Sequence, residues 1–235
     1  MFIDIHNHIL FGVDDGAEDI EESFDMLEDA KSQGAEAVIL TPHYRHGMFG
    51  YPLERIEENY QKLDKLAAKL GISLYLGCEY HVNSEIVANL QDGRCRTLAG
   101  SDYVLMEYSY QTEYSRIADY TGRLLSCGYI PVIAHVERYK CLQKQPSLCG
   151  ELANRGAMIQ INADSILGID GRAAERFCKK LLKNQWADVI ASDAHGREER
   201  RSHMAKCQKS VEKAYGMTYA DRLFMGNPLR IINNG

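Results

Sequence analysis

Seven apolar stretches of strand length recur along the 235-residue chain and alternate with segments that have the pattern of helices. The expected strands are residues 2–8, 37–43, 73–79, 102–107, 130–135, 157–163 and 187–195. The expected helices are residues 18–33, 53–70, 113–127, 144–155 and 170–184, and four of the five are followed by a glycine, a common residue just beyond a helix end. Strands that alternate with helices form parallel sheets, so seven repeats predict an α/β barrel.

The chain is expected to form one domain, residues 1–235. Barrels of this size commonly fold as one unit, and no linker rich in Pro, Gly or Ser divides the sequence. The tail, residues 203–232, is predicted to form one or two helices that pack outside the barrel, with Asn227-Pro228 breaking the last of them.

Six of the seven expected strands end in side chains that bind divalent metals. In the first strand His6 and His8 are two residues apart, so their imidazoles point to the same side. Because the carboxyl ends of barrel strands meet at one mouth, these residues are expected to gather there. The candidate ligands are His6, His8, Asp14, His43, Glu79, Glu107, His135, Asp193 and His195. Only the sixth strand lacks such a residue; it offers Gln160 and Asn162 instead.

This ligand set is too large for one metal ion. First-row divalent metals take about four to six ligands each, so nine nitrogen and oxygen ligands predict a cluster of two or three ions. No cysteine belongs to the set, which disfavours a thiolate zinc site and favours Mn, Fe or Zn. Three ions carry about +6 and the four carboxylates −4, which leaves about +2 and suits a phosphate. Metal-bound water, acidified towards neutral pH, would supply a hydroxide that attacks phosphorus.

The composition excludes several other classes. A formal net charge of −6 and a pI near 5.8 argue against binding to nucleic acid or to an anionic membrane. No secretion signal and no membrane-length apolar segment is recognised, so a cytoplasmic location without membrane insertion is expected. The seven cysteines are odd in number and widely spaced, which indicates reduced thiols.

The motifs that carry these residues resemble a known family. They are D-I-H-N-H at residues 4–8, G-V-D-D-G at 12–16, T-P-H at 41–43, G-C-E at 77–79, I-A-H-V-E-R at 133–138 and S-D-A-H at 192–195. Together they resemble the PHP (polymerase and histidinol phosphatase) superfamily, and within it the bacterial manganese-dependent protein tyrosine phosphatases of capsule and exopolysaccharide biosynthesis. The resemblance covers essentially the whole chain.

The resemblance implies a distorted (β/α)7 TIM-like barrel, the PHP fold, with a trinuclear manganese centre. It assigns His6, His8, Glu79 and Asp193 to the first ion, Glu79 as a bridge with Glu107 and His135 to the second, and Asp14, His43 and His195 to the third. An Asp at position 14 favours the tyrosine phosphatase branch over the histidinol phosphatase branch. The implied substrate is the phosphotyrosine-containing tail of a bacterial tyrosine kinase, with phosphate as a product.

Two arginines are expected to bind the phosphate. Arg138 follows His135 by three residues, and Arg200 follows His195 by five, although Arg201 could serve in place of Arg200. A bidentate guanidinium suits phosphate oxygens. The aromatic residues of loop 44–52, with Tyr108 and Tyr110, could stack on a substrate ring or simply pack on the barrel rim.

A second phosphatase signature is present and is expected to be inactive. Cys149 and Arg155 match the C-x5-R pattern of cysteine phosphatases, but Leu148, Leu152 and Gly156 indicate the end of a helix and not a phosphate-binding loop. Two rival functions use the same fold: a phosphatase of small molecules such as histidinol phosphate, and a catalytically inactive regulator that binds the kinase. Loss of metal ligands would indicate the regulator, and none of the nine is missing.

Overall fold

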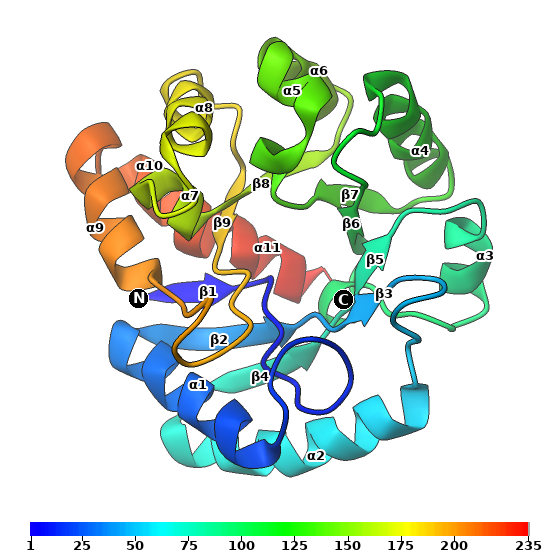
Figure 1. Ribbon diagram of the computed structural model, residues 1–235, viewed down its shortest axis with the longest axis vertical. Helices are drawn as coiled ribbons and strands as arrows, with labels where there is room; N and C mark the ends of the chain where they lie inside the picture. The colour runs from blue at the N-terminus through cyan, green and yellow to red at the C-terminus, as the bar shows by residue number, and fades with distance from the viewer. Residues whose placement is uncertain (235) are drawn as a thin grey trace.

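The computed structural model describes residues 1–234 and confirms a barrel of parallel strands ringed by helices (Figure 1). The strands are β1 Phe2–Asp4, β2 Ala35–Leu40, β3 His43–Tyr44, β4 Ser73–Leu76, β5 Glu79–His81, β6 Tyr103–Glu107, β7 Ile130–Ile133, β8 Met158–Asn162 and β9 Val189–Ala191. The sheet order is β1-β2-β4 in one part and β3-β5-β6-β7-β8-β9 in the other. Every pairing between these strands is parallel.

All nine strands lie at the positions of the seven expected ones, because two of the expected strands are each divided into two. β2 and β3 belong to one expected run, interrupted at Thr41-Pro42, and β4 and β5 belong to another, interrupted at Gly77-Cys78. Proline lacks the N–H that a sheet ladder needs, which explains the first break. The ring closes between the chain after β9 and the chain after β1, where the His8 N–H donates to the Ala194 carbonyl at 2.8 Å.

Helices cover the outside of the barrel (Figure 1). They are α1 Ile20–Gln33, α2 Leu53–Leu70, α3 Ile86–Gln91, α4 Tyr114–Ser126, α5 Lys140–Lys144, α6 Ser147–Asn154, α7 Ala163–Leu167, α8 Arg172–Lys183, α9 Met204–Tyr215, α10 Met217–Asp221 and α11 Asn227–Asn233. Short turns lie at η1 Leu98–Gly100, η2 Val136–Arg138 and η3 Arg222–Gly226. The expected helices are present, but the one expected over 144–155 begins only at Ser147 as α6, because Gln145-Pro146 separates it from α5, a short helix that the sequence did not predict.

Two hydrophobic clusters hold these layers together. The inner cluster fills the closed end of the barrel and contains Ile3, Ile39, Leu105, Val132 and Val189, one from each of five strands. The larger cluster lies between the sheet and the surrounding helices. Neighbouring strand residues alternate between the two clusters, as the period of two in a strand requires. The open end, at the carboxyl ends of the strands, is left to polar residues.

The tail departs from the prediction in two respects. Asn227-Pro228 does not break the last helix, because η3 is a π-helical turn that runs directly into α11 and places the proline in the first turn, where its missing N–H is not needed. α11 also does not lie on the outer wall. Ile231 belongs to the inner cluster, so this helix closes the bottom of the barrel.

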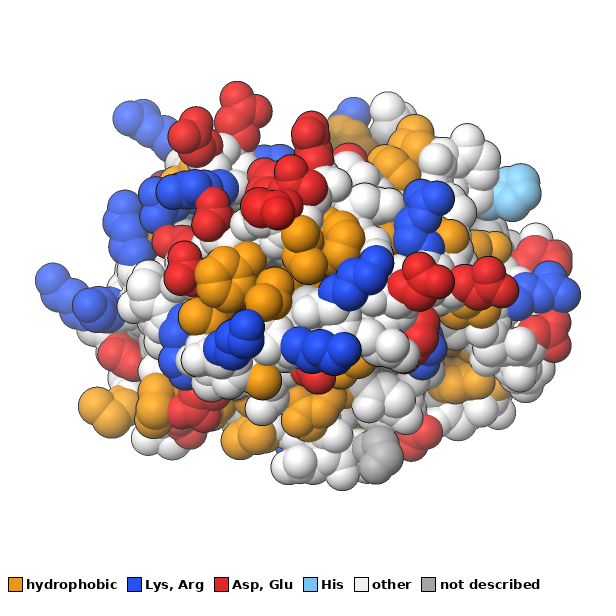
Figure 2. Space-filling view, turned by 90° about the horizontal axis from the view of Figure 1, so that it is seen from below, with side chains coloured by type: hydrophobic (Ala, Val, Ile, Leu, Met, Phe, Trp, Pro, Cys, Tyr) orange, Lys and Arg blue, Asp and Glu red, His pale blue; other side chains and the backbone are white. Residues whose placement is uncertain are grey.

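The outer surface has no strong charge of one sign on the face seen from the α2 side. Lys and Arg side chains alternate there with Asp and Glu side chains (Figure 2). This mixed pattern agrees with the modest net charge of −6. Among residues 1–234, no helix is both long enough and apolar enough to cross a membrane.

Candidate metal centre

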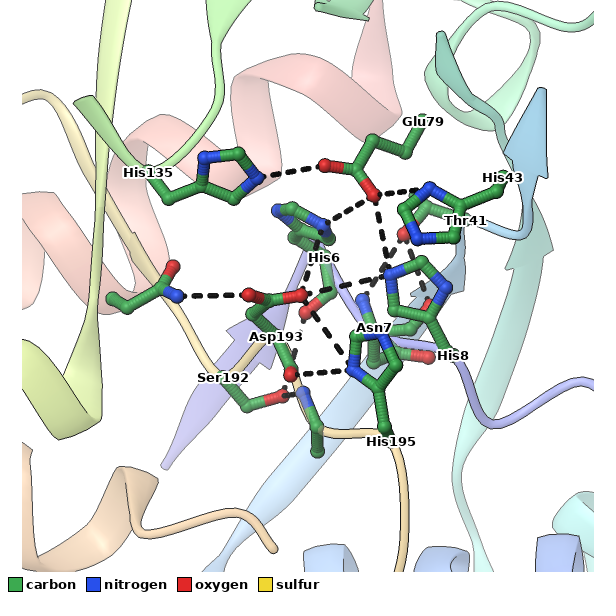
Figure 3. Close-up of polar contacts among 12 residues, drawn as sticks. His6, Asn7, His8, Thr41, His43, Glu79, His135, Ser192, Asp193 and His195 are labelled. Atoms are coloured by element: carbon green, nitrogen blue, oxygen red, sulfur yellow. Dashed lines mark hydrogen bonds and ion pairs between the residues drawn. The ribbon is translucent and has the colours of Figure 1, made fainter. Parts of the chain in front are cut away.

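The ends of the strands bring the predicted ligands together, and seven of the nine are labelled in Figure 3: His6, His8, His43, Glu79, His135, Asp193 and His195. Four overlapping groups of side chains have ligand atoms close enough to share an ion. They are His6, His8 and Asp193; His6, Glu79 and His135; His43, Glu79 and Glu107; and His8, Asp15, His43 and His195. Eight of the nine predicted ligands are therefore in these groups, although Glu107 is grouped with His43 and not with His135.

Glu79 lies at the centre of the cluster. Its Oε2 is 3.2 Å from His6 Nε2 and 3.2 Å from His8 Nε2. The same oxygen is 2.9 Å from His43 Nδ1, while Oε1 is 2.8 Å from His135 Nε2. One carboxylate thus contacts four imidazoles from three different strand ends, which is the geometry of a bridging ligand.

Asp193 connects the cluster to the mouth. Its Oδ1 is 3.4 Å from His6 Nε2 and 3.6 Å from His8 Nε2. Its Oδ2 accepts hydrogen bonds from Arg138 at 2.6 Å and from the Asn162 amide at 2.9 Å. Asp193 has a left-handed backbone with φ of 53°, a strained conformation for a residue other than glycine and one that recurs at functional sites.

Asp14, expected from the sequence to be a metal ligand, is in none of the four candidate groups. Both Asp14 oxygens are occupied by hydrogen bonds: Oδ2 contacts His8 Nδ1 at 2.7 Å and accepts from the His43 N–H at 2.9 Å, and Oδ1 accepts from the Gly16 N–H. The neighbouring Asp15 faces the candidate ligands instead. Its Oδ1 is 3.4 Å from His43 Nε2 and 3.6 Å from His195 Nε2. Two adjacent aspartates in G-V-D-D-G cannot be told apart from the sequence, because the loop has no periodicity.

The loop passes so close to His8 that only a glycine fits at position 16. A Cβ at position 16 would overlap the carbonyl oxygen and the Cβ of His8. The loop therefore approaches the first strand closely enough for Asp14 to reach His8. Substitution of Gly16 would push the two aspartates away from the cluster.

The charges in the cluster are balanced by their neighbours. Burial opposes ionisation of Glu79 and Asp193, but the charge of His6 near Glu79 and of Arg138 near Asp193 holds both pKa values well below the usual range. Burial and the nearby Glu79 charge raise the pKa of Glu107 to about 7. Glu79 and Asp193 are therefore ionised at neutral pH, whereas Glu107 is stabilised as a carboxylate only by additional positive charge.

The cluster fits divalent ions because its buried atoms lack other partners. Six buried ligand atoms make no hydrogen bond within residues 1–234: His6 Nε2, His8 Nε2, His43 Nδ1, Glu79 Oε2, Glu107 Oε2 and His195 Nε2. A buried polar atom without a partner is costly. These six atoms converge on the same pocket, and imidazole with carboxylate suits Mn, Fe or Zn.

Both predicted arginines lie beside the cluster, and Arg200 faces it whereas Arg201 does not. Arg200 lies 3.7 Å from Asp15 Oδ2 and 3.7 Å from Asp193 Oδ2. Arg201 points away and pairs with Asp29. A cavity of about 550 Å³ opens beside Arg200, His195 and Asp15. A group held by Arg138 and Arg200 would therefore lie against the cluster.

The aromatic loop mainly packs on the rim. Tyr44 lies against Tyr80, with ring centroids 4.8 Å apart, and buried Tyr51 donates to the Gly77 carbonyl. Phe49 is different, because its ring stacks on His43 at 5.2 Å with planes 9° apart. The sequence did not single out this contact with a ligand.

The sequence left open whether Tyr108 and Tyr110 stack on a substrate ring or pack on the barrel rim, and the structure places the two differently. Tyr108 is buried and packs edge-on against Tyr139. Tyr110 is 51% exposed and lies under Lys140. Only Tyr110 is therefore accessible to a ligand.

Cys149 lacks the features of a phosphatase nucleophile. It is fully buried in α6, where the intervening residues of the C-x5-R match are helical. Burial also raises the pKa of its thiol. A helix interior leaves no ring of free N–H groups for a phosphate.

The fold and the cluster define a class of barrel hydrolase whose imidazole and carboxylate groups can bind divalent metal. The model of the family described as "Capsular polysaccharide synthesis, CpsB/CapC" matches residues 2–233, so the chain belongs to this family. The tyrosine-protein phosphatase CpsB of Streptococcus pneumoniae is 33% identical over 237 residues, which are 98% of each chain. The tyrosine-protein phosphatase YwqE of Bacillus subtilis is 34% identical over 218 residues, covering 91% of this chain and 85% of that one.

Solved structures agree with the sequence relatives. One from the work on YwqE and CpsB, described as unique metal-dependent tyrosine phosphatases, superimposes with a TM-score of 0.92 at 30% identity, covering 99% of this chain and 94% of that chain. The phosphotriesterase homology protein of Escherichia coli superimposes with a TM-score of 0.61 over 97% of each chain, but at 10% identity it supports the fold alone.

Proposed function

We propose that this chain is a metal-dependent protein tyrosine phosphatase that hydrolyses phosphotyrosine on the tail of a bacterial tyrosine kinase controlling capsule or exopolysaccharide synthesis. The observation that carries the proposal is the set of buried, unpartnered imidazole and carboxylate atoms beside two arginines. The activity of the family members CpsB and YwqE supports it. The free cysteines fit a cytoplasmic location.

The centre is proposed to hold two or three divalent ions, with Mn favoured over Fe and Zn. The proposed ligands are His6, His8, Asp15, His43, Glu79, Glu107, His135, Asp193 and His195. Asp15 replaces Asp14 in this set, so the number of carboxylates stays at four and the charge balance expected from the sequence is unchanged. Such ions supply Lewis acidity and an acidified water at neutral pH.

The protein's own groups supply orientation and charge. Arg138 and Arg200 bind the oxygens of the phosphoryl group and hold it over the cluster. Asp193 keeps Arg138 in place through its 2.6 Å contact. Glu79 holds four imidazoles from three strand ends in place, so that the ligand geometry is fixed before substrate arrives.

The test uses the whole chain stripped with a chelator and then supplied with Mn²⁺. We expect turnover of a phosphotyrosyl peptide to disappear on stripping and to return with Mn²⁺, with a higher kcat/KM than for histidinol phosphate. Elemental analysis should find two or three ions per chain. Activity that survives complete chelation, or a preference for histidinol phosphate, would contradict the proposal, and metal binding without turnover of either substrate would favour an inactive regulator.

A further inference from the structure

β8 is the strand that supplies no metal ligand, and it presents two buried amides to the ligands of its neighbours. Gln160 and Asn162 are 0% and 2% exposed. Their spacing of two residues puts both side chains on the same face of the strand. Gln160 Nε2 donates to Asn162 Oδ1 at 2.8 Å, so the two amides form a connected pair.

One end of this pair fixes the orientation of Gln160. The backbone N–H of His135 can only donate, and it contacts Gln160 Oε1 at 2.8 Å, so this atom is the carbonyl oxygen. The same oxygen lies 3.1 Å from His6 Nδ1. An acceptor at that position requires a proton on His6 Nδ1, so that Nε2, which faces Glu79 and Asp193, is the nitrogen that a neutral His6 offers to an ion.

The other end of the pair fixes Asp193. An ionised carboxylate can only accept, and Asn162 Nδ2 donates to Asp193 Oδ2 at 2.9 Å. Oδ1 of Asp193 is thereby left facing His6 and His8. The backbone N–H of Asn162 donates to Glu137 Oε1 at 2.9 Å, which anchors the end of β8 itself.

We infer that Gln160 and Asn162 are positioning residues for the metal site of His6, His8 and Asp193: Gln160 selects the His6 tautomer that offers Nε2, and Asn162 orients the Asp193 carboxylate. The inference rests on the metal-binding part of the proposed function. Hydrogen bonds of this kind to ligating groups typically change metal affinity by about 10- to 100-fold.

A set of matched variants tests the first half of this arrangement. Gln160→Met removes the hydrogen bonds while keeping the length of the side chain, and Gln160→Glu keeps an oxygen acceptor for His6. Ile161→Val is the control, because it alters the same buried strand without touching the amide pair. Thermal unfolding of the chelated proteins confirms that each variant is folded.

The main readout is Mn²⁺ affinity and stoichiometry, measured by calorimetry on the stripped full chain. We expect the tightest Mn²⁺ site to weaken by about 10- to 100-fold in Gln160→Met, to recover most of that affinity in Gln160→Glu, and to be unchanged in Ile161→Val. Wild-type affinity and stoichiometry in a folded Gln160→Met protein would overturn the inference.

A second readout needs no variant. In the wild-type protein loaded with diamagnetic Zn²⁺, the imidazole ¹⁵N spectrum should show His6 protonated on Nδ1. Zinc bound through His6 Nδ1 would overturn the inference even if Gln160→Met does not fold. Neither readout uses turnover, so a protein that binds metal without phosphatase activity would contradict the proposed function and leave this inference standing.

Discussion

The two sides of the metal cluster are built differently. On the inner side, His6 and Asp193 have side chains that are at most 2% exposed, and neutral amides from Gln160 and Asn162 hold them. On the rim side, His8 is held by the carboxylate of Asp14; both of these side chains are buried, but the neighbouring candidate ligand Asp15 is 44% exposed. Two neutral amides therefore hold the His6 and Asp193 side of the cluster, whereas a carboxylate holds His8, next to the exposed Asp15.

The cost of burying charge explains this difference. The inner side already contains Glu79 and Asp193, and the pKa of Glu107, raised to about 7 by burial and the Glu79 charge, shows how poorly the surroundings of Glu79 tolerate a further carboxylate without bound cations. A neutral amide orients ligands without adding charge. At the rim, Asp14 is stabilised by N–H donors from the surrounding loop, and its pKa is lowered because the charge of His8 outweighs its burial.

The largest loss of activity is expected for Glu79, which contacts both sides of the cluster. Glu79→Ala removes the carboxylate that contacts both sides, so we expect turnover to be abolished while the barrel, whose core lies below the cluster, remains folded. Phosphatase assays, circular dichroism and elemental analysis would check this. If the variant kept both its metals and its activity, the cluster could not be the active site.

Arg138→Ala probes the connection between the inner side and the mouth. Removal of one preorganised donor typically lowers kcat by about 100- to 1000-fold, and we expect a loss of this size with ions still bound. Steady-state kinetics and metal analysis on the same preparation would separate the two effects. Wild-type kinetics would make Arg138 an ordinary structural partner of Asp193.

Separate substitutions of the adjacent Asp14 and Asp15 test whether the first orients His8 and the second binds an ion. Asp15→Asn should remove one ion from the stoichiometry, because Asp15 faces His43 and His195. Asp14→Asn should keep the stoichiometry and weaken Mn²⁺ binding by about 10- to 100-fold, since it only orients His8. The reverse result in calorimetry would restore Asp14 as the ligand.

A smaller effect is expected for the second arginine. Arg200 is nearly half exposed and 3.7 Å from its carboxylate partners, so Arg200→Ala should lower kcat/KM by about fivefold. Arg201→Ala is the matched control and should leave kinetics unchanged, because Arg201 pairs with Asp29 away from the mouth. Equal losses in both variants would point to a general charge effect.

The smallest effect is expected far from both sides of the cluster. Cys149→Ser should keep near-normal turnover of the phosphotyrosyl peptide, because the thiol is buried in α6 and burial raises its pKa. The chelated wild-type protein is the comparison. An inactive serine variant together with an active chelated protein would replace the metal mechanism with a thiolate mechanism.

The regular elements were predictable because their signals are periodic. The apolar runs and glycine stops indicated the strands and most helices, and ligand types at strand ends indicated the cluster. The tail was predicted less well. Pro228 interrupts a helical pattern in sequence, but a preceding π turn accommodates it, and the packing of Ile231 against the strands decides where the last helix lies.

The barrel, the kinds of candidate ligand and the strands that carry them could be predicted from the sequence, because they follow from local periodicity and from the rule that parallel strands end at one mouth. Only the folded structure shows which of the two aspartates, Asp14 or Asp15, and which of the two arginines, Arg200 or Arg201, faces the cluster, and which groups Gln160 and Asn162 contact. Such choices depend on the direction of a side chain in a loop or pocket. That direction is set by hydrogen bonds to residues distant in sequence, such as Gln160 to His6, and only folding brings those residues together.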